Sequence, residues 1–266
     1  MRVPPRDSTA YIVGFAAVVC LVCAIPIASA AVLLRPKQQQ NQRIDRLSKV
    51  LGVAELMRAG ERLSATDVES RFERSVVARA VELKTGAFTD AVDARTFDQR
   101  KAARDPSTSH PVPPNEARVF RVPNHAVVYE VMKDGKVDAL VLPIQGYGLW
   151  STMYGFLALE ADATTISGIT FYEHGETPGL GGEIENPAWQ AKWKGRKAFG
   201  DGGEVKVKVI KGAAGPPNDD PFHVDGLSGA TITSRGVSHT LDFWLGPDGF
   251  GPFLDQYRAA RREGGR

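Results

Sequence analysis

The clearest hydrophobic pattern in the chain is an uninterrupted apolar run near its start. Residues 11–34 contain no charged side chain over 24 positions. As a helix rising about 1.5 Å per residue, this run is about 36 Å long, enough to cross a hydrocarbon layer of about 30 Å with some tilt. The pattern predicts a transmembrane helix over 11–34 that contacts membrane lipid, preceded by a short cytoplasmic tail over 1–10.

A cleaved signal peptide is the alternative interpretation of the same segment. Arg2 and Arg6 give a basic start, and residues 28–30 (Ala-Ser-Ala) resemble a small-residue cleavage site. The apolar run nevertheless continues past that site to Leu34 and ends at Arg35, where a spanning helix would end. We therefore expect a retained anchor. Under both interpretations the C-terminal part is exported across the membrane.

Behind the apolar run, the pattern changes to amphipathic helices. Apolar residues recur at helical spacing among polar ones through 38–59, which predicts a helix leaving the membrane. A second helix is expected to begin near Thr66, which has the spacing of a capping box with Glu69. These patterns predict a helical connecting region over 35–104.

A proline-rich segment is the expected domain boundary. Residues 105–115 (DPSTSHPVPPN) carry four prolines and must be a loop or linker. Beyond it, two β-rich runs within 127–144 flank Asp134-Gly135, a dipeptide that tolerates the positive φ angles of a tight turn. We expect an antiparallel hairpin there.

The remaining pattern is mixed. Strand-like runs follow at 149–159, 165–172 and 204–210, and the last of these alternates strictly as VKVKVI. Asn186 and Pro187 have the character of a helix cap and a first-turn residue.

The last predicted helix runs over 231–245 on an apolar stripe. The order of elements predicts an α+β fold, in which an N-terminal transmembrane helix is followed by a largely antiparallel-sheet domain flanked by helices. That domain is expected over 116–257, and the basic tail over 258–266 is expected to be disordered.

Composition and charge exclude several classes of function. With 33 basic and 31 acidic residues, the net charge of +2 provides no field for nucleic acid. The only cysteines, Cys20 and Cys23, lie inside the apolar run, so the exported part has neither a disulfide framework nor a thiol catalyst. The five histidines are scattered, and none has the spacing of a metal site. We expect no metal, no catalytic residue and no dinucleotide fold.

The segment with candidate chemistry is 225–234, which has the sequence DGLSGATITS. The Thr231 hydroxyl follows Ser228, Gly229 and Ala230, and these small residues allow a bulky phosphate to approach the backbone. If a helix begins here, its free N–H groups favour an anion at Thr231. The spacing alone equally fits an N-cap turn with Ser228 or Thr231 as the cap.

Family resemblance favours the first interpretation. The string D-G-L-S-G-A-T matches each fixed position of D-x-x-S/T-G-A-T, the flavinylation signature of the FMN-binding domain family. Two further blocks, 148–160 (GLWSTMYGFLALE) and 168–194 (GITFYEHGETPGLGGEIENPAWQAKWK), resemble the C subunits of sodium-translocating NADH:quinone oxidoreductases. The similarity extends over most of the chain and is weak between about 61 and 115 and in the tail.

The resemblance implies a covalent flavoprotein. FMN would be joined by a phosphoester to Thr231 through a separate flavin transferase, next to Ser228, Gly229 and Ala230. Glu176, Thr177 and Leu180 of the glycine-rich loop, together with Leu149, Trp150 and Ser151, are the other expected contacts of the cofactor.

It also implies a place in the cell. The chain would be an electron-transfer subunit of a six-subunit, sodium-transporting NADH:ubiquinone reductase, incomplete as an enzyme by itself. It would be a single-pass protein of a bacterial inner membrane with its soluble domain on the periplasmic side.

Two other functions fit parts of the pattern. One is the equivalent flavinylated subunit of an Rnf-type ferredoxin:NAD complex, although the strings 148–155 (GLWSTMYG) and 171–182 (FYEHGETPGLGG) favour the quinone reductase. The other is a membrane-anchored binding module without redox chemistry, whose glycine-rich loop holds a partner. That module would show no covalent yellow chromophore after denaturation.

Overall fold

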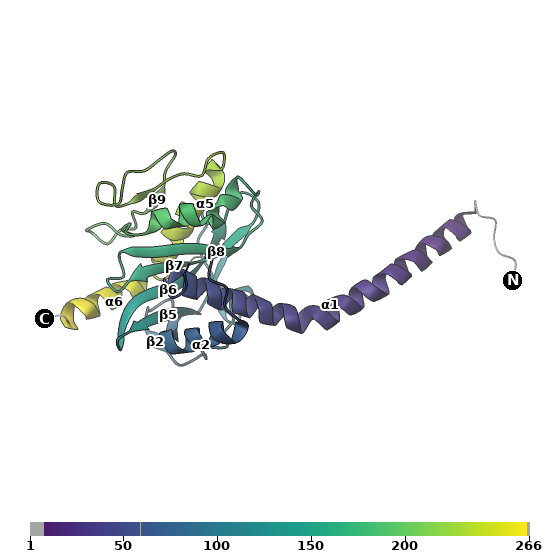
Figure 1. Cartoon of the computed structure of the whole chain (residues 1–266), viewed down its shortest axis with the longest axis horizontal. Helices are drawn as coiled ribbons and strands as arrows, with labels where there is room; N and C mark the ends of the chain where they lie inside the picture. Colours follow the sequence, from purple (N-terminus) through teal and green to yellow (C-terminus); the bar gives the residue numbers. More distant parts are fainter. Residues whose placement is uncertain (1–7, 59, 265–266) are drawn as a thin grey trace. The chain divides into compact units, whose positions relative to one another are not determined.

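The computed structural model describes residues 8–58 and 60–264. It divides into two compact units between Asp45 and Arg46. Among the described residues, the first unit consists of helix α1 (Thr9–Val53) as far as Asp45; the helix is drawn in purple in Figure 1 and has Pro26 and Pro36 inside it. Among the described residues, α1 is the one helix long and apolar enough to cross a membrane, as expected for 11–34.

Helix α1 does not end at residue 34, where the predicted transmembrane segment ends. It continues without a break to Val53, so the expected amphipathic helix is the second half of the same element. Its last residues belong to the second unit, in which Val50, Leu51 and Val53 are buried. The division of the chain therefore lies near residue 45, and the proline-rich segment 105–115 is not the boundary that its composition predicted.

The expected helical connecting region over 35–104 is only partly helical. Helix α2 (Ala65–Ser75) begins one residue before the expected position, because the Ser64 side chain accepts a hydrogen bond from the Asp67 N–H at 3.2 Å. Strand β1 (Val76–Glu82) follows at once, with no glycine or proline to mark the change. The prediction was wrong for this strand, because the apolar spacing of α2 continues into it.

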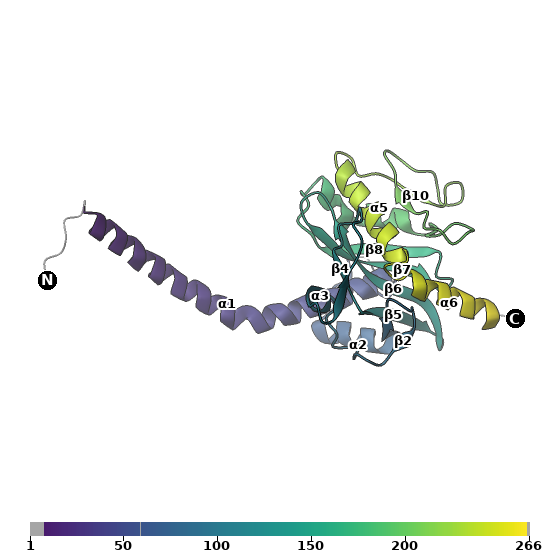
Figure 2. The same ribbon diagram turned by 180° about the vertical axis from the view of Figure 1, so that it is seen from behind.

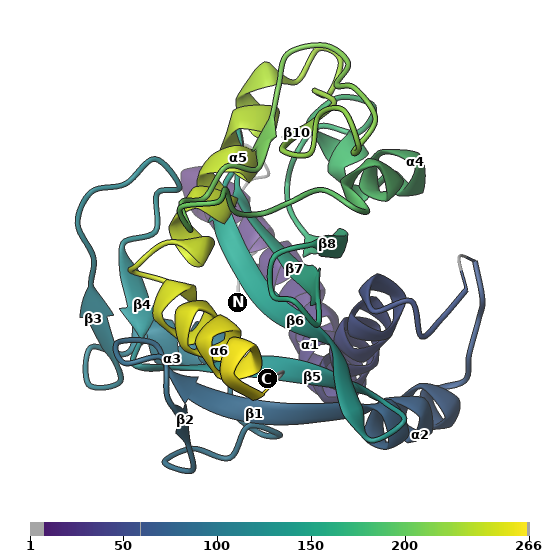
Figure 3. The same cartoon turned by 90° about the vertical axis from the view of Figure 1, so that its left-hand side faces the viewer.

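A six-stranded sheet forms the centre of the second unit. Its order is β2-β1-β5-β6-β7-β8, and all neighbouring strands are antiparallel, as Figure 3 shows. The strands not yet introduced are β2 (Phe88–Thr89), β5 (His125–Lys133), β6 (Lys136–Tyr147), β7 (Thr152–Glu160) and β8 (Ile166–Glu173). This arrangement confirms the predicted α+β class.

The β5–β6 hairpin forms where the sequence predicted it. Asp134 and Gly135 have φ angles of 50° and 74°, which is the left-handed backbone that a tight two-residue turn requires. Only a residue such as glycine or aspartate adopts these angles at low cost.

Shorter elements surround the sheet. They are α3 (Gln99–Arg104), the antiparallel pair β3 (Ser109–Pro111) and β4 (Arg121–Pro123), the 3₁₀ helices η1 (Gly181–Glu185) and η2 (Ala191–Trp193), α4 (Pro187–Gln190), and the parallel pair β9 (Lys208–Val209) and β10 (His223–Val224). Asn186 caps α4 and Pro187 is its first residue, as predicted.

The predicted strand at 204–210 is mostly wrong. Its alternation is real, since Val207 and Val209 are buried while Lys206 and Lys208 are exposed. Only Lys208 and Val209 pair with β10, because no longer strand lies beside this segment. Alternation of apolar and polar residues indicates which side chains face the core. A strand also needs a neighbouring strand with which its backbone forms hydrogen bonds.

Two consecutive helices cover one face of the sheet, as the view from behind in Figure 2 and the end view in Figure 3 show. Helix α5 (Thr231–Leu245) has the predicted bounds and packs on β6. The approach is close: a Cβ at Gly146 would lie 2.0 Å from the Thr240 hydroxyl oxygen. Val237, Leu241 and Trp244 of α5 complete the core above the sheet.

The last helix corrects the expected disordered tail. Helix α6 (Gly251–Gly264) includes most of 258–266, and residues 265–266 lie outside the described residues. Pro252 stands at the second residue of the helix, where its missing N–H has no cost. Buried Phe253 and Leu254 anchor the helix to the core.

Candidate functional site

The candidate site is the start of α5, where Thr231 is the first helical residue. Ala230 is the N-cap, with φ −128°, and no side chain caps the helix. The interpretation of Ser228 or Thr231 as an N-cap is therefore wrong. Because the first N–H groups of a helix have no intrahelical acceptor, this end of α5 is a favourable position for an anion.

The turn before α5 is shaped by glycine. Gly229 has φ +70°, and a Cβ there would lie 2.9 Å from Cδ2 of Leu180. Ser228, Gly229 and Thr231 are exposed, while Ala230 is buried. The turn therefore leaves Thr231 exposed to solvent, and Leu180 lies beside Gly229 of the same turn.

A buried carboxylate holds the site together. Glu176 is only 4% exposed, and its oxygens accept hydrogen bonds from the backbone N–H groups of Leu149 (3.1 Å), Trp150 (2.9 Å) and Ser151 (3.3 Å). The Thr233 hydroxyl donates to the same carboxylate at 2.5 Å. Three segments far apart in the sequence, the loop after β6, the loop after β8 and the first turn of α5, thus meet at one side chain.

The charge of Glu176 is stabilised in the folded protein. Burial raises the pKa of its carboxyl, but the Thr233 hydroxyl and the backbone N–H groups of Trp150, Leu149 and Ser151 outweigh this, so the pKa lies below the ordinary value.

The carboxylate also excludes side chains around it. A Cβ at Gly148 would lie 2.6 Å from its Oε1, and one at Gly181 would lie 2.9 Å from its Oε2. These glycines are therefore part of the packing around Glu176.

Apolar side chains lie exposed on the segments that Glu176 joins. Leu149 is 41% exposed, Trp150 64%, Leu180 45% and Ile232 50%. Exposed apolar groups that gather at one place mark a binding surface more often than scattered ones do. We call these four residues the apolar rim.

The two remaining predicted contacts lie on the same loops. The Ser151 hydroxyl accepts a hydrogen bond from the Gly175 N–H at 2.6 Å, which joins the loop after β6 to the loop after β8. Thr177 is exposed, and its carbonyl accepts from the N–H groups of Leu180 and Gly182 at 3.1 and 2.9 Å. The structure thus brings the predicted site residues together in three adjoining segments.

Asp225 has a structural role in the turn before α5. Its Oδ1 accepts from the Ala214 N–H at 3.0 Å, its Oδ2 pairs with the Lys192 ammonium, and its carbonyl accepts from Trp189 Nε1 at 2.8 Å. The nearby ammonium compensates the negative charge. Asp225 therefore stabilises the turn beside a site that favours anions.

Several residues that hold the site together were not predicted from the sequence. Thr233 and Ser234 are buried, and the Ser234 hydroxyl accepts from the Leu227 N–H at 3.0 Å, which holds the turn against α5. His174 accepts from the Glu176 N–H at Nδ1 (3.1 Å), and its Nε2 lies 3.2 Å from Glu185. A signal was present, since Thr233 falls on the apolar stripe four residues before Val237, where a hydroxyl needs an internal partner.

These residues fit a phosphorylated, ring-bearing cofactor. An uncapped helix start suits a phosphate group, an exposed hydroxyl suits an ester, and the apolar rim suits a flat ring system. The fit depends on the chain's own groups: no side chain caps α5, and Glu176 is directed toward internal donors and away from solvent.

Comparison with known proteins gives consistent results. Residues 148–246 match the FMN-binding domain family. The C subunit of the Na(+)-translocating NADH-quinone reductase of Pseudomonas aeruginosa is 45% identical over 256 residues, covering 95% of this chain and 97% of that protein. The protein of the same name from Vibrio anguillarum is 47% identical over 240 residues, covering 90% and 91%.

Solved structures agree with this result. The crystal structure of Shewanella oneidensis NqrC has a TM-score of 0.75 at 36% identity and covers 84% of this chain and 99% of that one. The crystal structure of the C subunit of the Na(+)-translocating NADH-quinone reductase from Parabacteroides distasonis has a TM-score of 0.64 at 30% identity, with coverages of 83% and 96%.

Proposed function

The chain belongs to the family of C subunits of the Na(+)-translocating NADH-quinone reductase, and on that premise we propose that it carries FMN covalently, as a phosphoester on Thr231. It is an FMN-carrying subunit of that oxidoreductase complex. The names of its relatives favour this complex over an Rnf-type ferredoxin:NAD complex.

One observation supports the attachment site above all others. Thr231 is an exposed hydroxyl at the first position of a helix that no side chain caps. An attached phosphate would lie next to the free N–H groups and the positive end of the helix dipole. The motif D-G-L-S-G-A-T places small residues before it, so that a transferase has access to the hydroxyl.

The rest of the site would hold and orient the group. The isoalloxazine ring supplies the redox chemistry, and the protein supplies position and environment. Leu180, Leu149 and Trp150 would cover part of the ring, with Thr177 and Ser151 at its edge. Glu176 would act indirectly, by fixing the loops that carry these side chains relative to Thr231.

The topology follows from the same premise. We infer that residues 11–34 anchor the chain among the lipids of the inner membrane and that the domain from Arg46 onward lies on the periplasmic side. A covalent bond would keep the cofactor in place there, where free flavin is not supplied. Partners would be the other members of a six-subunit complex and, during maturation, a flavin transferase.

The test is a denaturing gel. The protein is co-expressed with a flavin transferase, denatured, separated and viewed under ultraviolet light. We expect a fluorescent band for the wild type and none for Thr231→Ala, whereas Thr66→Ala, an exposed threonine on α2, keeps the full signal. A fluorescent Thr231→Ala band would move the attachment to another residue.

A further inference from the structure

A second candidate site lies away from the apolar rim, between the β7–β8 turn and the end of α6. A surface cavity of about 430 Å³ is lined there by Ala161, Asp162, Thr164, Arg258, Arg261 and Arg262. Three of these six residues are arginines, and all three come from the last turns of α6. We call this site the arginine cavity.

Arg258 is held in a fixed position in this cavity. Its side chain is 12% exposed, and its guanidinium donates to the Ala163 carbonyl at 3.2 Å and to Asp255 at 2.5 Å. The guanidinium carbon also lies 4.0 Å from the centre of the Phe199 ring. A cation with its geometry set in advance loses little entropy when it binds an anion.

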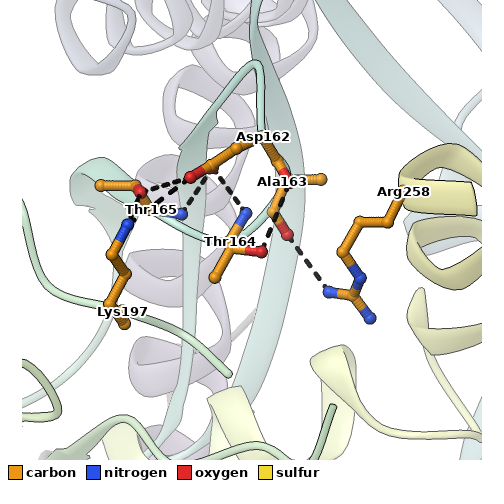
Figure 4. Close-up of polar contacts among 6 residues, drawn as sticks. All are labelled: Asp162, Ala163, Thr164, Thr165, Lys197 and Arg258. Atoms are coloured by element: carbon orange, nitrogen blue, oxygen red, sulfur yellow. Dashed lines mark hydrogen bonds and ion pairs between the residues drawn. The ribbon is translucent and has the colours of Figure 1, made fainter. Parts of the chain in front are cut away.

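The acidic residue of the lining does not neutralise the arginines. Asp162 accepts from the N–H groups of Thr164 (2.8 Å) and Thr165 (2.7 Å) and from the Thr165 hydroxyl (2.6 Å). Its other contact is the Lys197 ammonium at 3.6 Å. Figure 4 shows Asp162 directed toward Thr165 and Lys197, while Arg258 reaches the turn from the other side.

Two positive charges are therefore left without an acidic partner. Arg261 contacts the Tyr257 hydroxyl at 3.0 Å and the Val137 carbonyl at 3.4 Å, both of them neutral. Arg262 is exposed, and within the described part of the chain neither side chain forms an ion pair. Arginines at a helix end also complement its dipole, but that role alone requires no hollow between them and a neighbouring turn.

We propose that the arginine cavity binds a phosphate group. Guanidinium groups match the oxygens of a phosphate with two parallel hydrogen bonds, and Thr164 adds a hydroxyl at the edge. The volume exceeds that of one phosphate, so the remainder of a phosphate ester fits as well. The phosphate comes either from the headgroup of an anionic phospholipid or from a free phosphate in solution.

The experiment uses the full-length protein in detergent. Binding of inorganic phosphate is measured by titration calorimetry, and retention of phosphatidylglycerol against phosphatidylcholine is measured by native mass spectrometry. The test variant is Arg261→Gln/Arg262→Gln, which leaves the structural Arg258 in place. The control is Arg62→Gln/Arg74→Gln, which removes the same charge from exposed positions near α2.

We expect the wild type and the control to bind at least one probe, and the test variant to bind it about tenfold more weakly, because charge-assisted hydrogen bonds are lost. Binding of the lipid alone assigns the site to a headgroup, and binding of phosphate assigns it to a soluble anion. The proposal is overturned if neither probe binds, or if the test variant and the control bind equally well.

Discussion

The starts of α4 and α5 solve the same physical problem in opposite ways. The first N–H groups of every helix lack acceptors. At α4, Asn186 accepts from the Ala188 N–H at 2.9 Å and Pro187 removes one donor, so the helix start is closed. At α5, Ala230 provides no side-chain acceptor and the helix start is open.

The segment around α4 also stabilises the turn before α5. From the α4 segment, Trp189 donates to the Asp225 carbonyl, and Lys192 pairs with the Asp225 carboxylate. These contacts fix the turn that leads to Thr231. The comparison shows that the chain caps a helix where only stability is needed, and leaves a helix uncapped where, on our proposal, a phosphate becomes the cap.

Among substitutions near the open start of α5, Glu176→Gln is expected to have the largest effect on stability. The glutamine amide keeps one acceptor oxygen and replaces the other with an NH₂ group. That NH₂ group faces N–H and O–H donors, which therefore lose their acceptor. We expect the free energy of unfolding to fall by about 2–3 kcal/mol. The measurement is urea unfolding in detergent, followed by tryptophan fluorescence.

Flavin attachment should fall in parallel, because Glu176 fixes the loops around Thr231. The matched control is Glu116→Gln, an exposed glutamate that should change neither quantity. If Glu176→Gln behaved like that control, Glu176 would not be the residue that holds the site together.

Low pH should reduce the contribution of the Glu176 carboxylate to the free energy of unfolding. The folded pKa of Glu176 lies below its ordinary value of 4.5, so its contribution is complete above that value and is lost as the pH falls through the folded pKa. We expect the difference in unfolding free energy between wild type and Glu176→Gln to be constant from about pH 8 to about pH 5. The difference should then shrink below about pH 4.5, and a difference that instead grew in acid would contradict the assigned direction of the pKa.

The smallest expected effects come from removing the N-cap of α4 and adding an N-cap to α5. Asn186→Ala should cost about 1 kcal/mol and leave flavin attachment intact. Ala230→Ser adds the missing cap, and in protein made without flavin transferase it should stabilise by about 0.5 kcal/mol. Urea unfolding measures both changes, and a destabilised Ala230→Ser would mean that α5 is not open to a cap.

The sequence predicted those parts of the fold that local signals determine. The turn residues Asp134 and Gly135 located the hairpin, the dipeptide Asn186-Pro187 located α4, and the apolar stripe located α5. Strand β1 was missed because it follows α2 without a turn residue. Strand β9 was predicted too long because pairing depends on a partner distant in the sequence.

The residues of the candidate site likewise fall into those that local sequence predicted and those that it did not. Thr231 and the small residues before it form a continuous motif, which is visible in the sequence. The contact between Glu176 and Thr233 joins residues 57 positions apart, and no local spacing encodes it. Glu176 was therefore predicted as a contact of the cofactor, whereas its carboxylate is hydrogen-bonded to the loop around the site.

The central claim is the ester at Thr231, and mass spectrometry tests it most directly. Mature protein is isolated from its native membrane and digested, and the peptide that contains 225–234 is sequenced by fragmentation. We predict that this peptide carries the added mass of an FMN phosphoester, located on Thr231. An unmodified peptide, or the same mass located on another residue, would contradict the account.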